Sequence, residues 1–80
     1  MNTTSVVRDR ILQLCDERGR AIHKLATESA VSPSSVKNIL YGKSKDPKIL
    51  TIKKLCDGFG ITLGAFFHTP EFDKLEQEIK

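Results

Sequence analysis

The chain of 80 residues lacks the features that mark membrane and exported proteins. No apolar run approaches the roughly 20 residues that a membrane-spanning helix requires. The first ten residues, MNTTSVVRDR, contain no apolar core of the signal-peptide type. We therefore expect a cytoplasmic protein with a single domain, because a chain of this length builds one small core.

Residues suited to metal binding and catalysis are also scarce. Two cysteines and two histidines are too few for a metal site at the usual ligand spacing. Cys15 and Cys56 each lie within an apolar helical pattern, so we expect two reduced, buried thiols. No carboxylate pair, nucleophile–base set or phosphate-binding loop occurs at useful spacing. We expect no enzymatic activity, no cofactor and no small-molecule ligand.

What the sequence does contain is an uneven distribution of positive charge, within a net charge of +3. Residues 20–48 carry six basic and two acidic side chains, whereas residues 69–80 carry two basic and four acidic side chains. The basic side chains of the first segment are Arg20, Lys24, Lys37, Lys43, Lys45 and Lys48. Such clustering favours a polyanion as a partner on one side of the molecule.

Apolar residues recur at helical spacing along the chain and nowhere alternate as in a strand. The pattern predicts an all-α fold with five helices and a short sixth helix at the C-terminus. Thr3, Thr4 or Ser5 is expected to cap the first helix, which ends at Gly19. The apolar positions of this helix are Val7, Ile11, Leu14 and Cys15.

The later helices have recognisable start and stop residues. The fourth helix is expected to present on one face Ile49, Ile52, Leu55, Cys56 and Phe59. Gly60 ends it, and Thr62 caps a fifth helix that runs through Phe67. The sixth begins at Thr69-Pro70-Glu71 and carries an apolar stripe made of Phe72, Leu75 and Ile79. We place the domain at residues 1–68 and a helical tail at residues 69–80.

Two short helical patterns meet in residues 21–42. Each has one narrow apolar face, formed by Ile22, Leu25 and Ala26 in the first and by Val36, Ile39 and Leu40 in the second. Ser32 is a good cap for the second helix, Pro33 suits its first position, and Gly42 stops it. Only Ser29-Ala30-Val31 separates the two, which is a tight turn. This is the pattern of a helix-turn-helix, whose second helix can enter the major groove of DNA.

A longer series of residues continues this motif in a recognisable order. It comprises Leu25-Ala26, Val31-Ser32, Val36, Ile39, Gly42, Asp46-Pro47, Leu55-Cys56-Asp57 and Gly60-Ile61-Thr62-Leu63 before Phe66-Phe67. The series lies within residues 7–67 and resembles the Cro/lambda-repressor type of helix-turn-helix domain, often called the XRE family. The resemblance implies a compact five-helix lambda-repressor-like domain that binds double-stranded DNA.

The chain departs from this family at two positions. Ala30 stands where the family prefers glycine in the turn, and a left-handed backbone there would cost roughly 1–2 kcal/mol. Ile22 stands where the family often has a glutamine that contacts a phosphate. Because the Ile22 side chain can only pack, we expect that contact to be missing.

The third helix supplies the residues that we expect to read bases. If its apolar face points inward, the step of about 100° per residue turns outward Ser34, Asn38 and Tyr41, with Ser35 and Lys37 beside them. Asn38 is suited to adenine N6 and N7, and Lys37 to guanine O6 or N7. We therefore predict base contacts by Ser34, Lys37 and Asn38. For Ser34 and Ser35, ordinary polar helix surface is the alternative interpretation.

Side chains around this helix are expected to contact phosphates, which fix the register but carry no sequence information. We assign this role to Lys24, Ser35, Tyr41, Lys43 and Lys45, with His23 and Lys48 as further candidates. Backbone N–H groups around Gly42 and Lys43 can also donate to phosphates. Tyr41 has an alternative, because its ring can instead pack against the following loop.

The sequence thus favours a transcriptional regulator, most simply a repressor that occupies a palindromic operator as a homodimer. The alternative is a protein-interaction adaptor or antitoxin-like module on the same scaffold. Phe72, Leu75 and Ile79 can form the dimer contact. Alternatively, the last helix folds back over Phe66 or Phe67 of its own domain.

Overall fold

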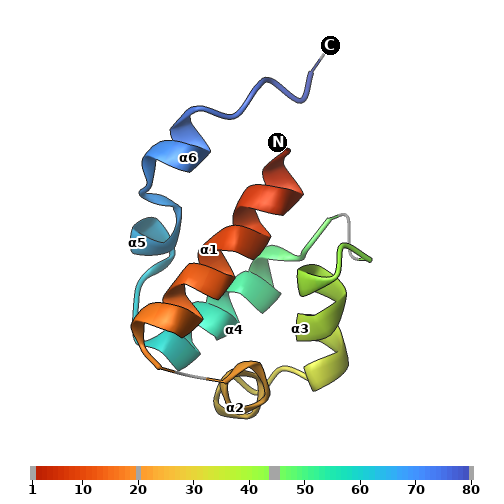
Figure 1. Cartoon of the computed structure of the whole chain (residues 1–80), viewed down its shortest axis with the longest axis vertical. Helices are drawn as coiled ribbons and strands as arrows, with labels where there is room; N and C mark the ends of the chain where they lie inside the picture. Colours follow the sequence, from red (N-terminus) through yellow and green to blue (C-terminus); the bar gives the residue numbers. More distant parts are fainter. Residues whose placement is uncertain (1, 20, 44–45, 80) are drawn as a thin grey trace.

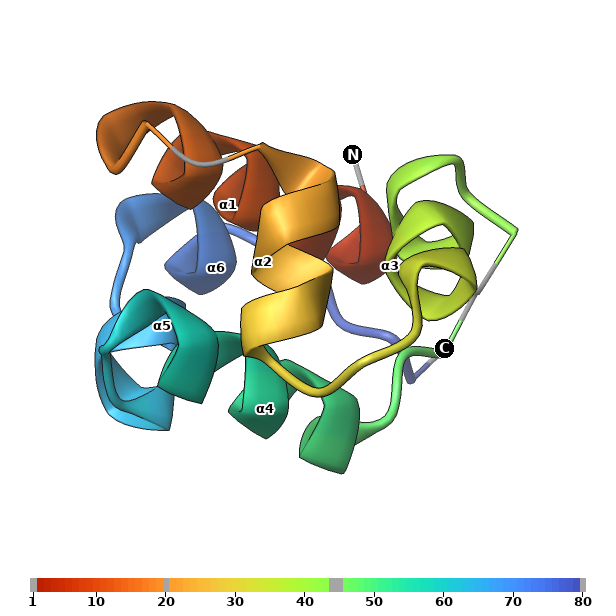
Figure 2. The same ribbon diagram turned by 90° about the horizontal axis from the view of Figure 1, so that it is seen from below.

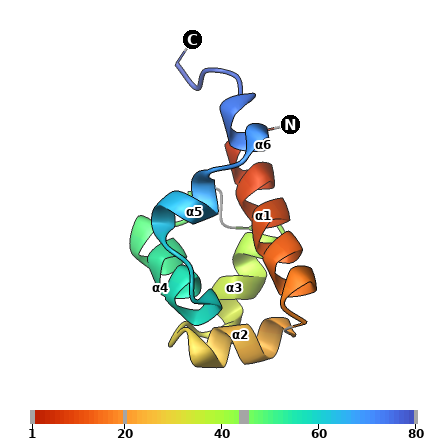
Figure 3. The ribbon, with the colours of Figure 1, turned by 90° about the vertical axis from the view of Figure 1, so that its left-hand side faces the viewer.

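The computed structural model describes residues 2–19, 21–43 and 46–79, and over these residues the fold is all-helical. In chain order the helices are α1 (Thr3–Glu17), α2 (Ile22–Glu28), α3 (Pro33–Leu40), α4 (Ile49–Phe59), α5 (Leu63–Phe67) and α6 (Pro70–Asp73). Figure 1 shows α3 at one edge of the molecule and α5 and α6 at the other. In Figure 3, α1 and α4 lie on opposite sides, and α2 crosses the end of the molecule below them. The prediction of five helices and a short sixth is confirmed.

The apolar faces predicted from helical spacing meet in one core. Its fully buried members include Ile11, Leu25, Val36, Leu55 and Phe66, which come from five different helices. Within α4, Ile49 departs from the prediction, because 58% of its surface is exposed. Its expected place on the buried face of α4 was wrong, since α4 begins outside the core and first enters it at Ile52.

Asn2, not Thr3, Thr4 or Ser5, caps the first helix. The Asn2 side-chain oxygen accepts a hydrogen bond from the Ser5 backbone N–H at 2.8 Å, and the three expected caps lie inside α1. Asparagine is at least as good an N-cap as serine or threonine, and starting at Asn2 satisfies the same orphan donors one residue earlier. The correction lengthens α1 without changing its buried face.

Arg10 of α1 and Arg18, the residue that caps the end of α1, bind the ends of other helices. Arg10 donates from Nε to the Phe66 carbonyl at 2.8 Å and from Nη2 to the Ala65 carbonyl at 2.9 Å. Arg18 donates from Nη1 to the Phe59 carbonyl at 2.8 Å. The last carbonyls of a helix have no partner within it, so these guanidinium groups satisfy acceptors that α4 and α5 leave open. α1 is thereby tied to the C-terminal third of the chain.

The C-terminal tail does not form the expected helical stripe. α6 has only four residues, so Leu75 and Ile79 lie beyond its end, and Ile79 is 88% exposed. The ring of Phe72 packs against those of Phe66 and Phe67, with centroids 6.2 and 5.0 Å apart. The stripe was wrong, and the fold-back alternative holds for Phe72. A short helix is marginally stable in water unless packing supports it. Phe72 is the residue of α6 that packs against the core, so the helix ends soon after it.

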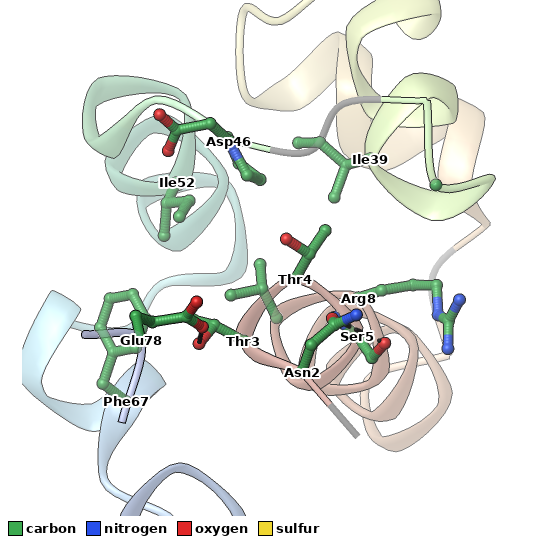
Figure 4. A pocket seen from close by; sticks show the side chains of 13 residues that line it. Asn2, Thr3, Thr4, Ser5, Arg8, Ile39, Asp46, Ile52, Phe67 and Glu78 are labelled. Carbon is green, nitrogen blue, oxygen red and sulfur yellow. Dashed lines mark hydrogen bonds between the residues drawn. The ribbon is translucent and has the colours of Figure 1, made fainter. Parts of the chain in front are cut away.

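Beyond α6 the tail returns to the start of α1. The Thr3 hydroxyl donates to Glu78 Oε2 at 2.6 Å. Figure 4 shows this pair at a pocket whose lining also includes Ile39 from α3, Ile52 from α4 and Phe67 from α5. The tail therefore lies against its own domain at the N-terminal end of α1.

Cys15 and Cys56 are buried and form no disulfide, as predicted. Burial raises the pKa of the Cys56 thiol above its ordinary value, and the neighbouring Asp57 carboxylate adds to the effect. Among the described residues, no group of three or more metal-ligating side chains occurs. In the same part of the chain, no helix is long and apolar enough to span a membrane.

Candidate nucleic-acid interface

The predicted helix-turn-helix is formed by α2, the turn and α3. Leu25 and Ala26 of α2 and Val36 of α3 are fully buried, and Val31 of the turn packs against the same core. Ala26 leaves room for the close approach of the two helices, because a larger side chain there would separate them. In Figure 2, α3 lies at the edge of the molecule, and no labelled helix covers its outer side. The core therefore fixes the inner face of α3 and leaves its outer face open.

The turn contains the left-handed residue that the sequence suggested. Ala30 has φ of +56°, and it is the only non-glycine residue with positive φ among those described. The Val31 N–H donates to the Ala26 carbonyl at 3.1 Å, and the Ala30 N–H to the Thr27 carbonyl at 3.3 Å. This pair of bonds closes the end of α2 as a Schellman motif. At the other positive-φ positions the chain uses glycine, at Gly19, Gly42 and Gly60.

Replacing Ala30 with glycine is expected to stabilise the domain by about 1 kcal/mol. The change removes a left-handed strain of roughly 1–2 kcal/mol, and the greater freedom of glycine in the unfolded chain offsets part of that gain. A urea unfolding curve measures the difference. A midpoint equal to or below that of the unsubstituted chain would contradict the assigned strain.

The start of α3 is built as predicted. Ser32 Oγ accepts from the Ser35 N–H at 3.2 Å, and Pro33 occupies the first turn. The hydroxyls of Ser32 and Ser35 also lie 2.8 Å apart, within hydrogen-bond distance. Ser35 is thus part of the cap, and its hydroxyl keeps capacity for up to two further partners.

The end of α3 corrects one expectation about phosphate donors. The Gly42 N–H donates to the Ile39 carbonyl at 3.4 Å, and the Lys43 N–H donates to the Asn38 carbonyl at 2.9 Å. Gly42 has φ of +77°, which completes a second Schellman motif. Both N–H groups are therefore occupied by the helix end, so the idea that they donate to phosphates was wrong.

The outer face of α3 carries the five polar residues that the helical spacing assigned to it. They are Ser34, Ser35, Lys37, Asn38 and Tyr41, and all five are exposed. Within the described residues, the side chains of Lys37 and Asn38 make no hydrogen bond, so their donors and acceptors face solvent. Tyr41 is 72% exposed, which contradicts the alternative that its ring packs against the following loop.

The other expected phosphate contacts are also on the surface. Lys24 and Lys43 are exposed, as are His23 and Lys48. Lys45 lies outside the described residues. Ile22 is partly buried against the core, which agrees with its expected packing role. Sequence reasoning missed that Leu50, at the start of α4, is 71% exposed.

Comparison with known proteins agrees with this geometry. Residues 10–71 match the family model of the Cro/C1-type HTH DNA-binding domain. The fold is similar to a crystal structure of the prophage Lp1 protein 11, with a TM-score of 0.82 and 30% sequence identity. That similarity covers 94% of this chain and 100% of the other. No curated protein matched the sequence.

Proposed function

Because the chain belongs to the Cro/C1-type HTH DNA-binding domain family, we propose that it is a transcriptional repressor that acts by occupying an operator in the cytoplasm. The family binds DNA and is not an enzyme family. The observation that carries the proposal is the open outer face of α3, whose inner face is fixed by buried Val36, Ile39 and Leu40. A helix held in this way can enter the major groove without rearrangement.

Ser34, Lys37 and Asn38 are the proposed base-reading residues. They project from α3 with side chains that are exposed. An asparagine amide matches the donor and acceptor of adenine in the major groove, and a lysine ammonium matches the two acceptors of guanine. Ser34 can donate to or accept from either kind of base edge. The three together read part of one half-site.

Lys24, Ser35, Tyr41, Lys43 and Lys45 are the proposed phosphate contacts. Lys24 lies on α2, whereas Tyr41 and Lys43 lie at and just beyond the end of α3, so the contacts would flank the recognition helix on both sides. Such contacts position the protein on the duplex and supply most of its sequence-independent affinity.

We also infer that two copies bind together, because one recognition helix covers only half of a typical operator. Two-fold symmetry then predicts a palindromic site with half-sites roughly 34 Å apart. The mass of the complex formed with a selected duplex is expected to equal two chains per duplex. A saturated complex with one chain per duplex would contradict the homodimer.

Selection of bound duplexes from a random DNA pool, followed by titration at several salt concentrations, tests the function. Selected duplexes are expected to bind at least about 1,000-fold more tightly than random duplexes. The logarithm of the binding constant should fall linearly with that of the salt concentration, by about 0.9 for each phosphate contact. If no duplex binds even at low salt, the chain is instead a protein-interaction adaptor or antitoxin-like module.

A further inference from the structure

Ser29, the first residue of the turn, has a hydroxyl group that is buried without a hydrogen-bond partner among the described residues. Its surface is only 5% exposed, and its Oγ has no hydrogen-bond partner among the described residues. A buried hydroxyl without a partner loses its bonds to water and gains none in return. Its position is therefore set by the packing around it.

That packing partner is Gly58, in the last turn of α4. A Cβ atom added at Gly58 would lie 2.1 Å from Ser29 Oγ, 3.2 Å from Ser29 Cβ and 3.4 Å from Ser29 Cα. Rotation of the Ser29 hydroxyl would relieve the first contact but not the second, because Cβ is fixed by the backbone. The backbone of the turn thus approaches α4 so closely that position 58 accommodates only glycine without displacement.

This contact bears on α3 because the turn is so short. Only Ala30, Val31 and Ser32 separate Ser29 from the start of α3, and the Ala30 and Val31 N–H groups are bonded back to α2. A displacement of Ser29 therefore displaces Pro33, because the short hydrogen-bonded turn cannot absorb the movement. We propose that Ser29 and Gly58 are positioning residues that set the place of α3 relative to the rest of the domain and hence its fit to the bases. This inference rests on the proposed function.

Gly58→Ala tests the inference, with Gly64→Ala as the matched control. A Cβ at Gly64 meets only Thr62 Oγ1, at 3.9 Å, so the same chemical change there is free of a clash. Gly58→Ala is expected to weaken binding to the selected operator by about tenfold or more, because bidentate base contacts depend on alignment. Binding to random duplexes should change much less, because phosphate contacts tolerate small displacements. Gly64→Ala should bind both duplexes like the unsubstituted chain.

A second substitution at Ser29, the other residue of the contact, distinguishes a positioning role from a general loss of structure. In the double variant Gly58→Ala, Ser29→Gly the clash is removed, and operator affinity should return to that of Ser29→Gly alone. If Gly58→Ala does not fold, Ser29→Thr applies a similar displacement from the other side by adding one methyl group, and the same selective loss is expected.

Parallel losses on operator and random duplexes, or a double variant that is not rescued, would overturn the inference. So would a folded Ser29→Thr variant with undiminished operator affinity. These outcomes differ from failure of the proposed function, in which the unsubstituted chain itself binds no duplex.

Discussion

Replacing Phe66 with alanine is expected to lower the free energy of unfolding by about 3–5 kcal/mol, which approaches the whole stability of many small domains. The Phe66 side chain is fully buried. Its ring meets that of Phe67 edge to face at a centroid distance of 4.9 Å, and the Arg10 guanidinium lies 6.0 Å from its centroid. Truncation leaves a cavity between α1, α5 and α6 that the surrounding residues cannot fill by small movements.

Urea unfolding followed by circular dichroism measures this effect, and Ile79→Ala is its control. Ile79 is 88% exposed, so its truncation should change stability by no more than about 0.5 kcal/mol. Phe66→Ala should be largely unfolded near 37 °C and should bind DNA weakly for that reason. A Phe66→Ala chain as stable as Ile79→Ala would show that the aromatic cluster does not hold the domain together.

The second large effect concerns base recognition by Asn38. Asn38→Ala is expected to weaken binding to the selected operator by about 1–3 kcal/mol, and to relax the base preference at one position of each half-site. The side chain is exposed on α3 and makes no hydrogen bond within the described residues, so truncation leaves the fold intact. Competition titrations with operators substituted one base pair at a time measure the effect.

Lys43→Ala is the matched comparison for Asn38→Ala. Its ammonium group is assigned to a phosphate, so its loss should weaken operator and random duplexes alike and reduce the salt dependence by about one contact. The two variants should therefore differ mainly in which duplexes lose affinity, and less in how much affinity the operator loses. Equal losses on operator and random DNA for Asn38→Ala would exclude it as a base-reading residue.

Much of the fold could be predicted because its signals are local. Ser32 and Pro33 start α3, and Gly42 and Gly60 end helices, through bonds within a few residues of each position. Such patterns can be read directly from sequence. Asn2 was missed because four neighbouring residues are all competent caps, and their choice depends on small differences.

Other features depended on contacts that periodicity does not report. The spacing of Ile49 and Ile52 is equally helical, but only the packed structure says where α4 leaves the core. The predicted stripe of Phe72, Leu75 and Ile79 likewise required a helix that reaches Ile79. Phe72 packs against the core, but α6 ends at Asp73. Helical spacing identifies a possible face and cannot say how much of it is used.

In the candidate interface, too, some features could be predicted from local sequence and others depended on tertiary contacts. The exposure of Ser34, Lys37 and Asn38 could be predicted from the apolar face of α3 and the helical rotation of about 100° per residue. The closeness of Ser29 to Gly58 had no such signal, because it joins residues far apart in sequence. A glycine inside a helical pattern was the one available hint, since glycine weakens a helix unless another chain segment needs the space.

The contacts of Arg10 in α1 also have a consequence for the nascent polypeptide. Arg10 leaves the ribosome well before its acceptor carbonyls, which lie 55 and 56 residues later, at Ala65 and Phe66. The hydrogen bonds that tie α1 to α5 therefore cannot form until α5 has been synthesised. A ribosome that stalls before Ala65 therefore holds a chain in which α1 lacks this attachment to the C-terminal part of the domain.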